Sequence, residues 1–119
     1  MFKFEPYSEP AIDMLDFWER RNEWSQETFG PQQERGPIGP LLHLRKEVEE
    51  AIQAHADGSP NRVVEEIVDC LFLVFDAANR AGLSYSALAK KCKEKLEINK
   101  ARTWSAVQPG VPCEHVRDV

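Results

Sequence analysis

The sequence has no excess of positive charge, no long apolar run and no paired cysteine motif, and each absence excludes a class of protein. Lysine and arginine number 15 against 20 aspartate and glutamate residues, which gives a formal net charge of −5. An acidic chain is unsuited to broad binding of a nucleic-acid backbone, because that backbone attracts basic surfaces. We therefore expect no nucleic-acid partner, although bound metal ions allow an acidic site to accept a nucleotide.

The three cysteines, Cys70, Cys92 and Cys113, are odd in number and far apart. They form neither a disulfide framework nor a zinc motif, which favours a reducing, cytoplasmic setting. The most apolar stretch, residues 70–78, contains an aspartate and is too short to span a bilayer. Because no signal-peptide pattern is present either, we expect a cytoplasmic protein with no membrane partner.

Several familiar catalytic motifs lack an essential member. The segment Gly36-Pro-Ile-Gly39 has two glycines but not the lysine and hydroxyl residue of a phosphate-binding P-loop. His43 and Glu47 have the i,i+4 spacing of a zinc-protease helix, but the second histidine is missing. No Ser-His-Asp arrangement is evident, so the chemistry has to come from other residues.

The length of 119 residues suits one domain with a small core, and the apolar periodicity predicts four helices. We expect these helices to begin near Pro10, Pro40, Pro60 (with Ser59 as its N-cap) and Ser84, and to end near Trp24 or beyond, His55, Ala81 and Asn99. Residues 57–60 form a turn that sends the third helix back along the second. The predicted fold is all-α, an antiparallel four-helix-type bundle over residues 1–119 with a mostly extended tail at 101–119.

Two carboxylate pairs, Glu47/Glu50 and Glu66/Asp69, lie on the predicted second and third helices. Each pair has i,i+3 spacing, which places both members on one helical face. If the two helices are antiparallel, all four carboxylates can converge. Oxygen ligands of this kind suit hard divalent ions such as magnesium or manganese. The pattern thus predicts a metal-dependent enzyme that acts on a phosphate substrate.

The alternative interpretation of these acids is surface charge, since i,i+3 carboxylates are common on solvated helices. It applies best to Glu47 and Glu50. It applies less well to the third helix, which is apolar over much of its circumference yet contains Asp69 and Asp76. A buried carboxylate needs a partner or a metal, and Arg80, four residues after Asp76, is a candidate partner. The third helix therefore favours a site.

The spacing Glu47-x-x-Glu50, fifteen residues, then Glu66-x-x-Asp69 resembles the signature of the MazG-like all-α nucleoside triphosphate pyrophosphohydrolases. Longer segments are similar to a phage and bacterial branch of that superfamily, the dATP/dGTP diphosphohydrolases that include the MazZ proteins. These segments are residues 24–31 (WSQETFGP), 36–47 (GPIGPLLHLRKE) and 95–104 (KLEINKARTW). The ending at residues 114–118 also resembles this branch.

The resemblance implies a helical bundle that forms a homodimer or homotetramer, with sites near subunit interfaces. It implies that Glu47, Glu50, Glu66 and Asp69 bind Mg²⁺ or Mn²⁺, with two or more ions in each site. The implied reaction converts a purine deoxynucleoside triphosphate, dGTP or dATP, to the monophosphate and pyrophosphate. In phage members it is linked to 2-aminoadenine DNA, which would place the enzyme in the host cytoplasm. The alternatives are another base preference in nucleotide house-cleaning, or a non-catalytic helical oligomerisation module.

Within this reaction, phosphoanhydride cleavage needs shielded phosphate charge, an activated water and an aligned leaving group. Glu47 or Glu50 is the candidate that orients the attacking water. Lys95 and Arg102 are candidates for holding the outer phosphates, because both are cationic donors.

The nucleoside half of the substrate has its own candidates. Asp76 and Asn79 are candidates for recognising the sugar or the base. Trp24 or Phe29 is a candidate for stacking on a purine. The alternative for this aromatic pair is a rigid connector in which both side chains fill the core.

Overall fold

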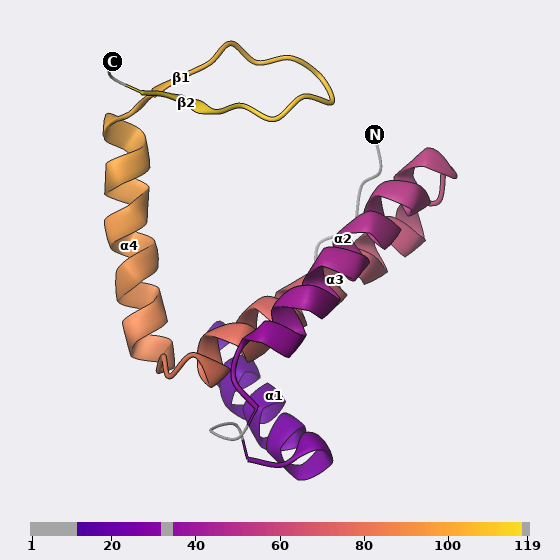
Figure 1. Cartoon of the computed structure of the whole chain (residues 1–119), viewed down its shortest axis with the longest axis vertical. Helices are drawn as coiled ribbons and strands as arrows, with labels where there is room; N and C mark the ends of the chain where they lie inside the picture. The colour runs from indigo at the N-terminus through magenta and orange to yellow at the C-terminus, as the bar shows by residue number, and fades with distance from the viewer. Residues whose placement is uncertain (1–11, 32–34, 118–119) are drawn as a thin grey trace. The chain divides into compact units, whose positions relative to one another are not determined.

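The computed structural model describes residues 12–31 and 35–117 (Figure 1), so the predicted helix start near Pro10 and the last residue of the 114–118 segment lie outside it. The described residues form four helices and one small sheet: α1 Met14–Phe29, α2 Ile38–Ala56, α3 Pro60–Arg80, α4 Tyr85–Ala101, β1 Thr103–Trp104 and β2 His115–Val116. The predicted all-α fold is confirmed.

The chain divides after Tyr85 into two compact units. The first contains α1, α2 and α3, and the second contains most of α4 together with the two strands. The packing of all four helices as one bundle in a single domain stays a prediction. None of the described helices is long and apolar enough to cross a membrane, and the cellular location also stays a prediction.

Helices α2 and α3 lie side by side and form the long arm of the first unit (Figure 1). The link between them reverses the chain at Gly58, whose φ of 70° lies in the left-handed region that favours glycine. Ser59 occupies the predicted N-cap position, but its side chain makes no capping hydrogen bond. Pro60 follows at the first helical position, where its missing N–H costs nothing. This antiparallel hairpin places α2 beside α3 and thereby brings the two acidic pairs close together.

The described first helix runs from Met14 to Phe29, and its end lies beyond Trp24 as the sequence allows. It begins after Asp13, whose side-chain oxygen accepts a hydrogen bond of 2.8 Å from the backbone N–H of Asp16. It continues past Trp24 and ends at Phe29. Gly30 then stops the helix with a φ of 89°. The extension places more of α1 against the third helix.

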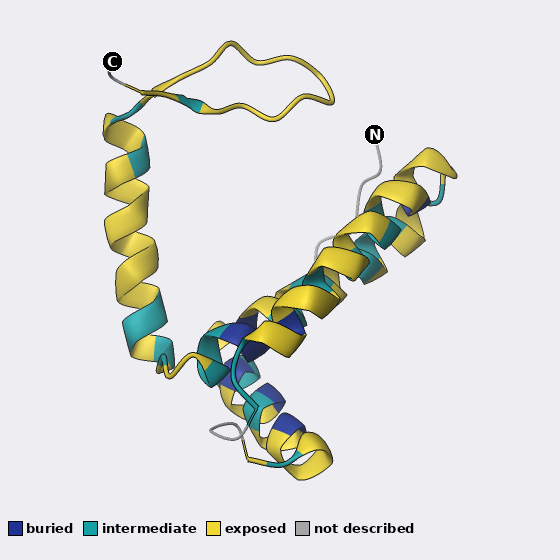
Figure 2. Ribbon diagram, viewed as in Figure 1, coloured by how far each residue is buried: buried dark blue, intermediate teal, exposed yellow. Residues whose placement is uncertain are grey.

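The core of the first unit is a cluster of aromatic side chains between α1 and the C-terminal half of α3. Phe17 and Trp18 of α1 pack against Phe72 and Phe75 of α3, with ring centroids 5.0–5.4 Å apart. Trp18 and Phe75 are both buried. Figure 2 shows the buried residues concentrated where these two helices meet. This packing fixes α1 beside the part of α3 that carries Asp76.

The second unit has very little buried surface. Helix α4 has no buried residue (Figure 2). After it, β1 and β2 pair in antiparallel register, with Thr103 opposite Val116 and Trp104 opposite His115. The indole N–H of Trp104 donates a 2.8 Å hydrogen bond to the carbonyl of Asn99. The extended tail that the sequence predicts therefore also contains a short β-pairing that the sequence did not indicate.

Candidate active site

Three of the four predicted metal-binding carboxylates converge between α2 and α3. Glu47, Glu66 and Asp69 each offer an oxygen, and these oxygens all lie within 4.8 Å of one another. Glu47 comes from α2, and the other two come from successive turns of α3. Glu50, one turn after Glu47, is not a member of this group. The hairpin thus builds most of the predicted acidic cluster from local helix geometry.

The carboxylates of this cluster perturb one another strongly. A hydrogen bond to Glu47, partial burial and the nearby charges of Glu47, Glu50 and Asp69 raise the pKa of Glu66 to about 7. The same hydrogen bond lowers the pKa of Glu47, and His43 contributes in the same direction. The Nε2 of His43 lies 2.9 Å from Oε1 of Glu47. The cluster is therefore stabilised by a shared proton or by a bound cation.

The donor set fits a divalent metal ion. All three groups are carboxylates, which are the ligands that Mg²⁺ and Mn²⁺ favour. One oxygen of Glu66, Oε2, is buried and has no hydrogen-bond partner in the described chain. An unsatisfied buried acceptor of this kind is relieved when a cation binds beside it.

A pocket of about 410 Å³ lies beside the acidic cluster, within the first unit. Glu47 and Asp69 line it, so the cluster faces the cavity. Three arginines, Arg21, Arg35 and Arg80, also contribute to the lining. The pocket therefore combines carboxylates that suit a metal with cations that suit an acceptor-rich ligand.

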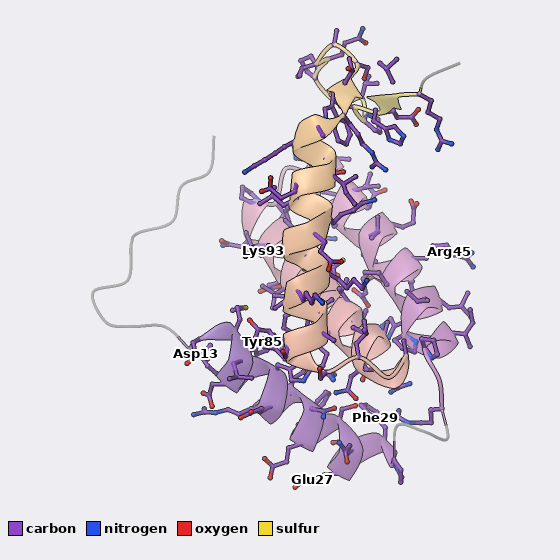
Figure 3. All side chains as sticks on the ribbon, turned by 90° about the vertical axis from the view of Figure 1, so that its left-hand side faces the viewer. Asp13, Glu27, Phe29, Arg45, Tyr85 and Lys93 are labelled. Atoms are coloured by element: carbon purple, nitrogen blue, oxygen red, sulfur yellow. The ribbon has the colours of Figure 1, made fainter. Side chains whose placement is uncertain are left out.

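The aromatic pair Trp24 and Phe29 lines the same pocket. Phe29 is the last residue of α1 (Figure 3). The two rings contact each other edge to face, with centroids 5.5 Å apart, and Arg35 lies 5.5 Å above the ring of Phe29. Both aromatic side chains are about half exposed, at 50% and 52%. The alternative in which they fill the core is wrong, and their contact with a purine stays a prediction.

Asp76 is buried in the pocket wall between two arginines. Its Oδ1 accepts hydrogen bonds from Nη1 of Arg21 at 3.0 Å and from Oγ of Ser25 at 3.2 Å. Its Oδ2 pairs with Nη2 of Arg80 at 2.9 Å. The ion pair with Arg80, given by the sequence as the alternative to substrate contact, is confirmed. Both oxygens of Asp76 are thus engaged by protein groups.

Sequence reasoning missed Arg21 and Ser25 as members of this site. They lie 55 and 51 residues before Asp76, so no local spacing connects them. The available signal was their i,i+4 spacing on α1, beside the apolar face that carries Trp18. Polar residues next to a core-facing tryptophan are candidates for burial, and both are buried.

The remaining predicted substrate contacts are not part of this pocket. Asn79 is half-buried on α3 and does not line the cavity. Lys95 and Arg102 belong to the second unit. Arg102 donates a 3.1 Å hydrogen bond to Oδ1 of Asn99. The substrate roles of these three residues stay predictions.

Helical architecture with a carboxylate cluster beside an arginine-containing pocket defines an all-α protein suited to phosphate chemistry. The model of the dATP/dGTP pyrophosphohydrolase family matches residues 17–119. The chain belongs to this family, whose members are hydrolases that act on nucleoside triphosphates. The resemblance seen in the sequence is confirmed, and the match includes both structural units.

The chain also has a phage relative. The chain is 39% identical over 113 residues to the Eaa protein of Salmonella phage P22. The alignment covers 94% of this chain but 33% of the relative, so the chain spans about a third of the length of that protein. No solved structure matches the chain.

Proposed function

We propose that the protein is a metal-dependent pyrophosphohydrolase that converts dGTP or dATP to the monophosphate and pyrophosphate. The observation that carries the proposal is the convergence of Glu47, Glu66 and Asp69 at the wall of a pocket that also contains arginines and aromatic rings. The family match supplies the reaction class. The phage relative favours a phage setting for it.

Glu47, Glu66 and Asp69 would hold the cation. When bound, a divalent ion neutralises phosphate charge and lowers the pKa of a coordinated water. Glu50 lies one helical turn from Glu47 and outside the three-carboxylate group, so we assign it the role of accepting the proton of the attacking water. The oxygen of that water joins the phosphorus of the monophosphate product, the bond between the α- and β-phosphates breaks, and pyrophosphate leaves.

The rest of the chain would bind the two ends of the nucleotide. Trp24 and Phe29 are half-exposed in the pocket and offer π-faces for a purine. Lys95 and Arg102 are proposed to contact the outer phosphates. Both lie in the region matched by the family model.

We also propose that the protein acts as a homodimer or homotetramer. Helix α3 exposes four large apolar residues on the described chain: Ile67, Val68, Leu71 and Val74. Apolar surface of this extent, together with an α4 that buries no residue, suits contact with a second copy. Light scattering coupled to size-exclusion chromatography tests this, and a monomer at micromolar concentration would contradict it.

The activity is tested by turnover of all common nucleoside and deoxynucleoside triphosphates with Mg²⁺ or Mn²⁺, with the products separated by chromatography. We expect monophosphate and pyrophosphate from dGTP and dATP, and little turnover of dCTP or dTTP. Diphosphate and orthophosphate would mean that a different bond is cut. A folded protein that turns over none of these substrates would refute the proposal.

A further inference from the structure

Arg21 and Arg80 share a single carboxylate and are left with unused hydrogen-bond donors. Arg21 contacts Asp76 through Nη1, while its Nε and Nη2 are buried and have no hydrogen-bond partner in the described residues. Arg80 contacts Asp76 through Nη2, and its Nε is likewise without a partner there. The two arginine side chains are only 2% and 9% exposed. Among the described residues, Arg21 and Arg80 therefore contribute three buried donors without an acceptor to the wall of the pocket.

The unused donors of Arg21 have a specific geometry. Nε and Nη2 lie on the same edge of a guanidinium group, so together they form a two-donor fork. Asp76 holds the opposite side of the group, and Ser25 supports Asp76. Arg21 is thus held to Asp76 through Nη1, while its fork stays unpaired among the described residues.

Packing alone does not account for this arrangement. A buried donor without an acceptor destabilises the fold, and two buried arginines with one carboxylate leave positive charge uncompensated. Burial lowers the pKa of Arg80 despite the opposing effect of Asp76, and the charges of Arg35 and Arg21 add to the lowering. Because all three arginines line the pocket, a ligand with hydrogen-bond acceptors would relieve both costs.

The position of the fork indicates which part of a nucleotide would reach it. Asp69, in the acidic cluster, and Asp76, at the arginines, are seven residues apart on α3, which is about 10 Å along a helix. If the phosphates of a nucleotide lie at the acidic cluster, its sugar comes next along the pocket and its base lies farthest from the cluster. Trp24 and Phe29, which offer faces for a base, line the same pocket. The arginine end is therefore the base end of the pocket.

We infer that Arg21, positioned by Asp76 and accompanied by Arg80, reads the N7 atom of a purine base, which explains a preference for purines over pyrimidines. The inference rests on the proposed function and specifies its base contact. N7 is an acceptor in both adenine and guanine, and pyrimidines have no counterpart. Guanine adds O6 beside N7, so the second donor of the fork favours dGTP over dATP. The contact requires the unpaired edge of Arg21 to turn toward the pocket that this residue lines.

The direct test replaces N7 of the substrate by a C–H group. We expect 7-deaza-dGTP and 7-deaza-dATP to show a kcat/KM about tenfold or more below that of dGTP and dATP, because each loses a hydrogen bond from a charged donor. Calorimetry without added metal should show a similar loss of affinity for 7-deaza-dGMP relative to dGMP. Equal values for normal and 7-deaza compounds would overturn the inference while leaving the pyrophosphohydrolase activity intact. If neither dGTP is hydrolysed nor dGMP bound, the proposed function and the inference fail together.

A pair of variants separates base reading from a structural role. Arg21→Lys keeps the charge but removes the fork, so the difference between dGTP and 7-deaza-dGTP should shrink to less than about threefold. Arg20→Lys changes the exposed neighbour, which pairs with Asp16, and should preserve the full difference. An arginine needed only for packing would lower activity on both substrates equally. If Arg21→Lys does not fold, the comparison of normal and 7-deaza substrates on the unaltered enzyme still tests whether N7 is read.

Discussion

The two ends of the pocket carry opposite imbalances of charge. At the acidic end, Glu47, Glu66 and Asp69 converge, and His43 pairs with Glu47. At the basic end, two arginines enclose one aspartate. Each end contains a buried polar atom without a partner among the described residues: a carboxylate oxygen at one, guanidinium nitrogens at the other. A cation would relieve the acidic end and an acceptor would relieve the basic end, and a metal-bound nucleotide would supply both.

The largest effect should come from removing a carboxylate at the acidic end. We expect Glu66→Gln to lower kcat/KM about a thousandfold, since a metal contributes several kcal/mol of transition-state stabilisation. Binding of Mn²⁺, followed by electron paramagnetic resonance, should weaken at the same time. The matched control is Glu65→Gln, an exposed neighbour on α3, which should retain near-normal activity. A Glu66 variant with unchanged turnover would remove this residue from the site.

At the basic end, the corresponding change should affect stability. Asp76→Asn leaves Arg21 and Arg80 buried without a counter-charge, so we expect the free energy of unfolding to fall by about 3–5 kcal/mol. The control, Asp16→Asn, breaks the exposed ion pair with Arg20 and should cost about 1 kcal/mol or less. The free energy of unfolding of both variants should be measured by urea denaturation at one protein concentration, because the unfolding of an oligomer depends on concentration. Equal losses in the two variants would mean that the buried network does not support the fold.

The difference between the two ends also explains what the sequence predicted. The acidic end is built from i,i+3 pairs and one turn at Gly58, which are local features that a sequence displays directly. At the basic end only Asp76 and Arg80 are close in the sequence, and their spacing predicts the ion pair as the alternative to a substrate contact by Asp76. Arg21 joins them because the aromatic core packs α1 on α3, and such a contact has no signature in the spacing of residues.

The helix boundaries show the same division between local and long-range signals. Proline and glycine mark the ends of α2 and α3, and the predictions for those helices are close to the structure. The start of α1 depends on Asp13 as a cap, and its end depends on Gly30, whereas the sequence places that end only near Trp24 or beyond. In the tail, the pairing of β1 with β2 joins residues from opposite ends of a loop, which an extended sequence does not specify.

The pKa of Glu66 predicts how the stability of the metal-free protein depends on pH. Its value of about 7 lies above the ordinary 4.5. Between these two pH values the folded protein binds more protons than the unfolded chain, so stability falls as the pH rises through this window. Thermal unfolding of the wild type should therefore show a steeper loss of stability from pH 5 to 7.5 than Glu66→Gln does. Identical slopes of stability against pH in the two proteins would mean that Glu66 does not hold a proton in the folded state. Saturating Mn²⁺ should reduce the slope of the wild type.

The smallest effect should come from His43, which pairs with Glu47 at the acidic end. Its side chain is 56% exposed, and exposed pairs contribute little. It competes with a metal for Glu47, so His43→Gln should tighten Mn²⁺ binding by at most about fivefold. A weakening of about tenfold or more would instead identify His43 as a ligand, because a neutral imidazole nitrogen donates directly to Mn²⁺. The acidic end would then be a mixed nitrogen and oxygen site, and its selectivity would shift from Mg²⁺ toward softer ions.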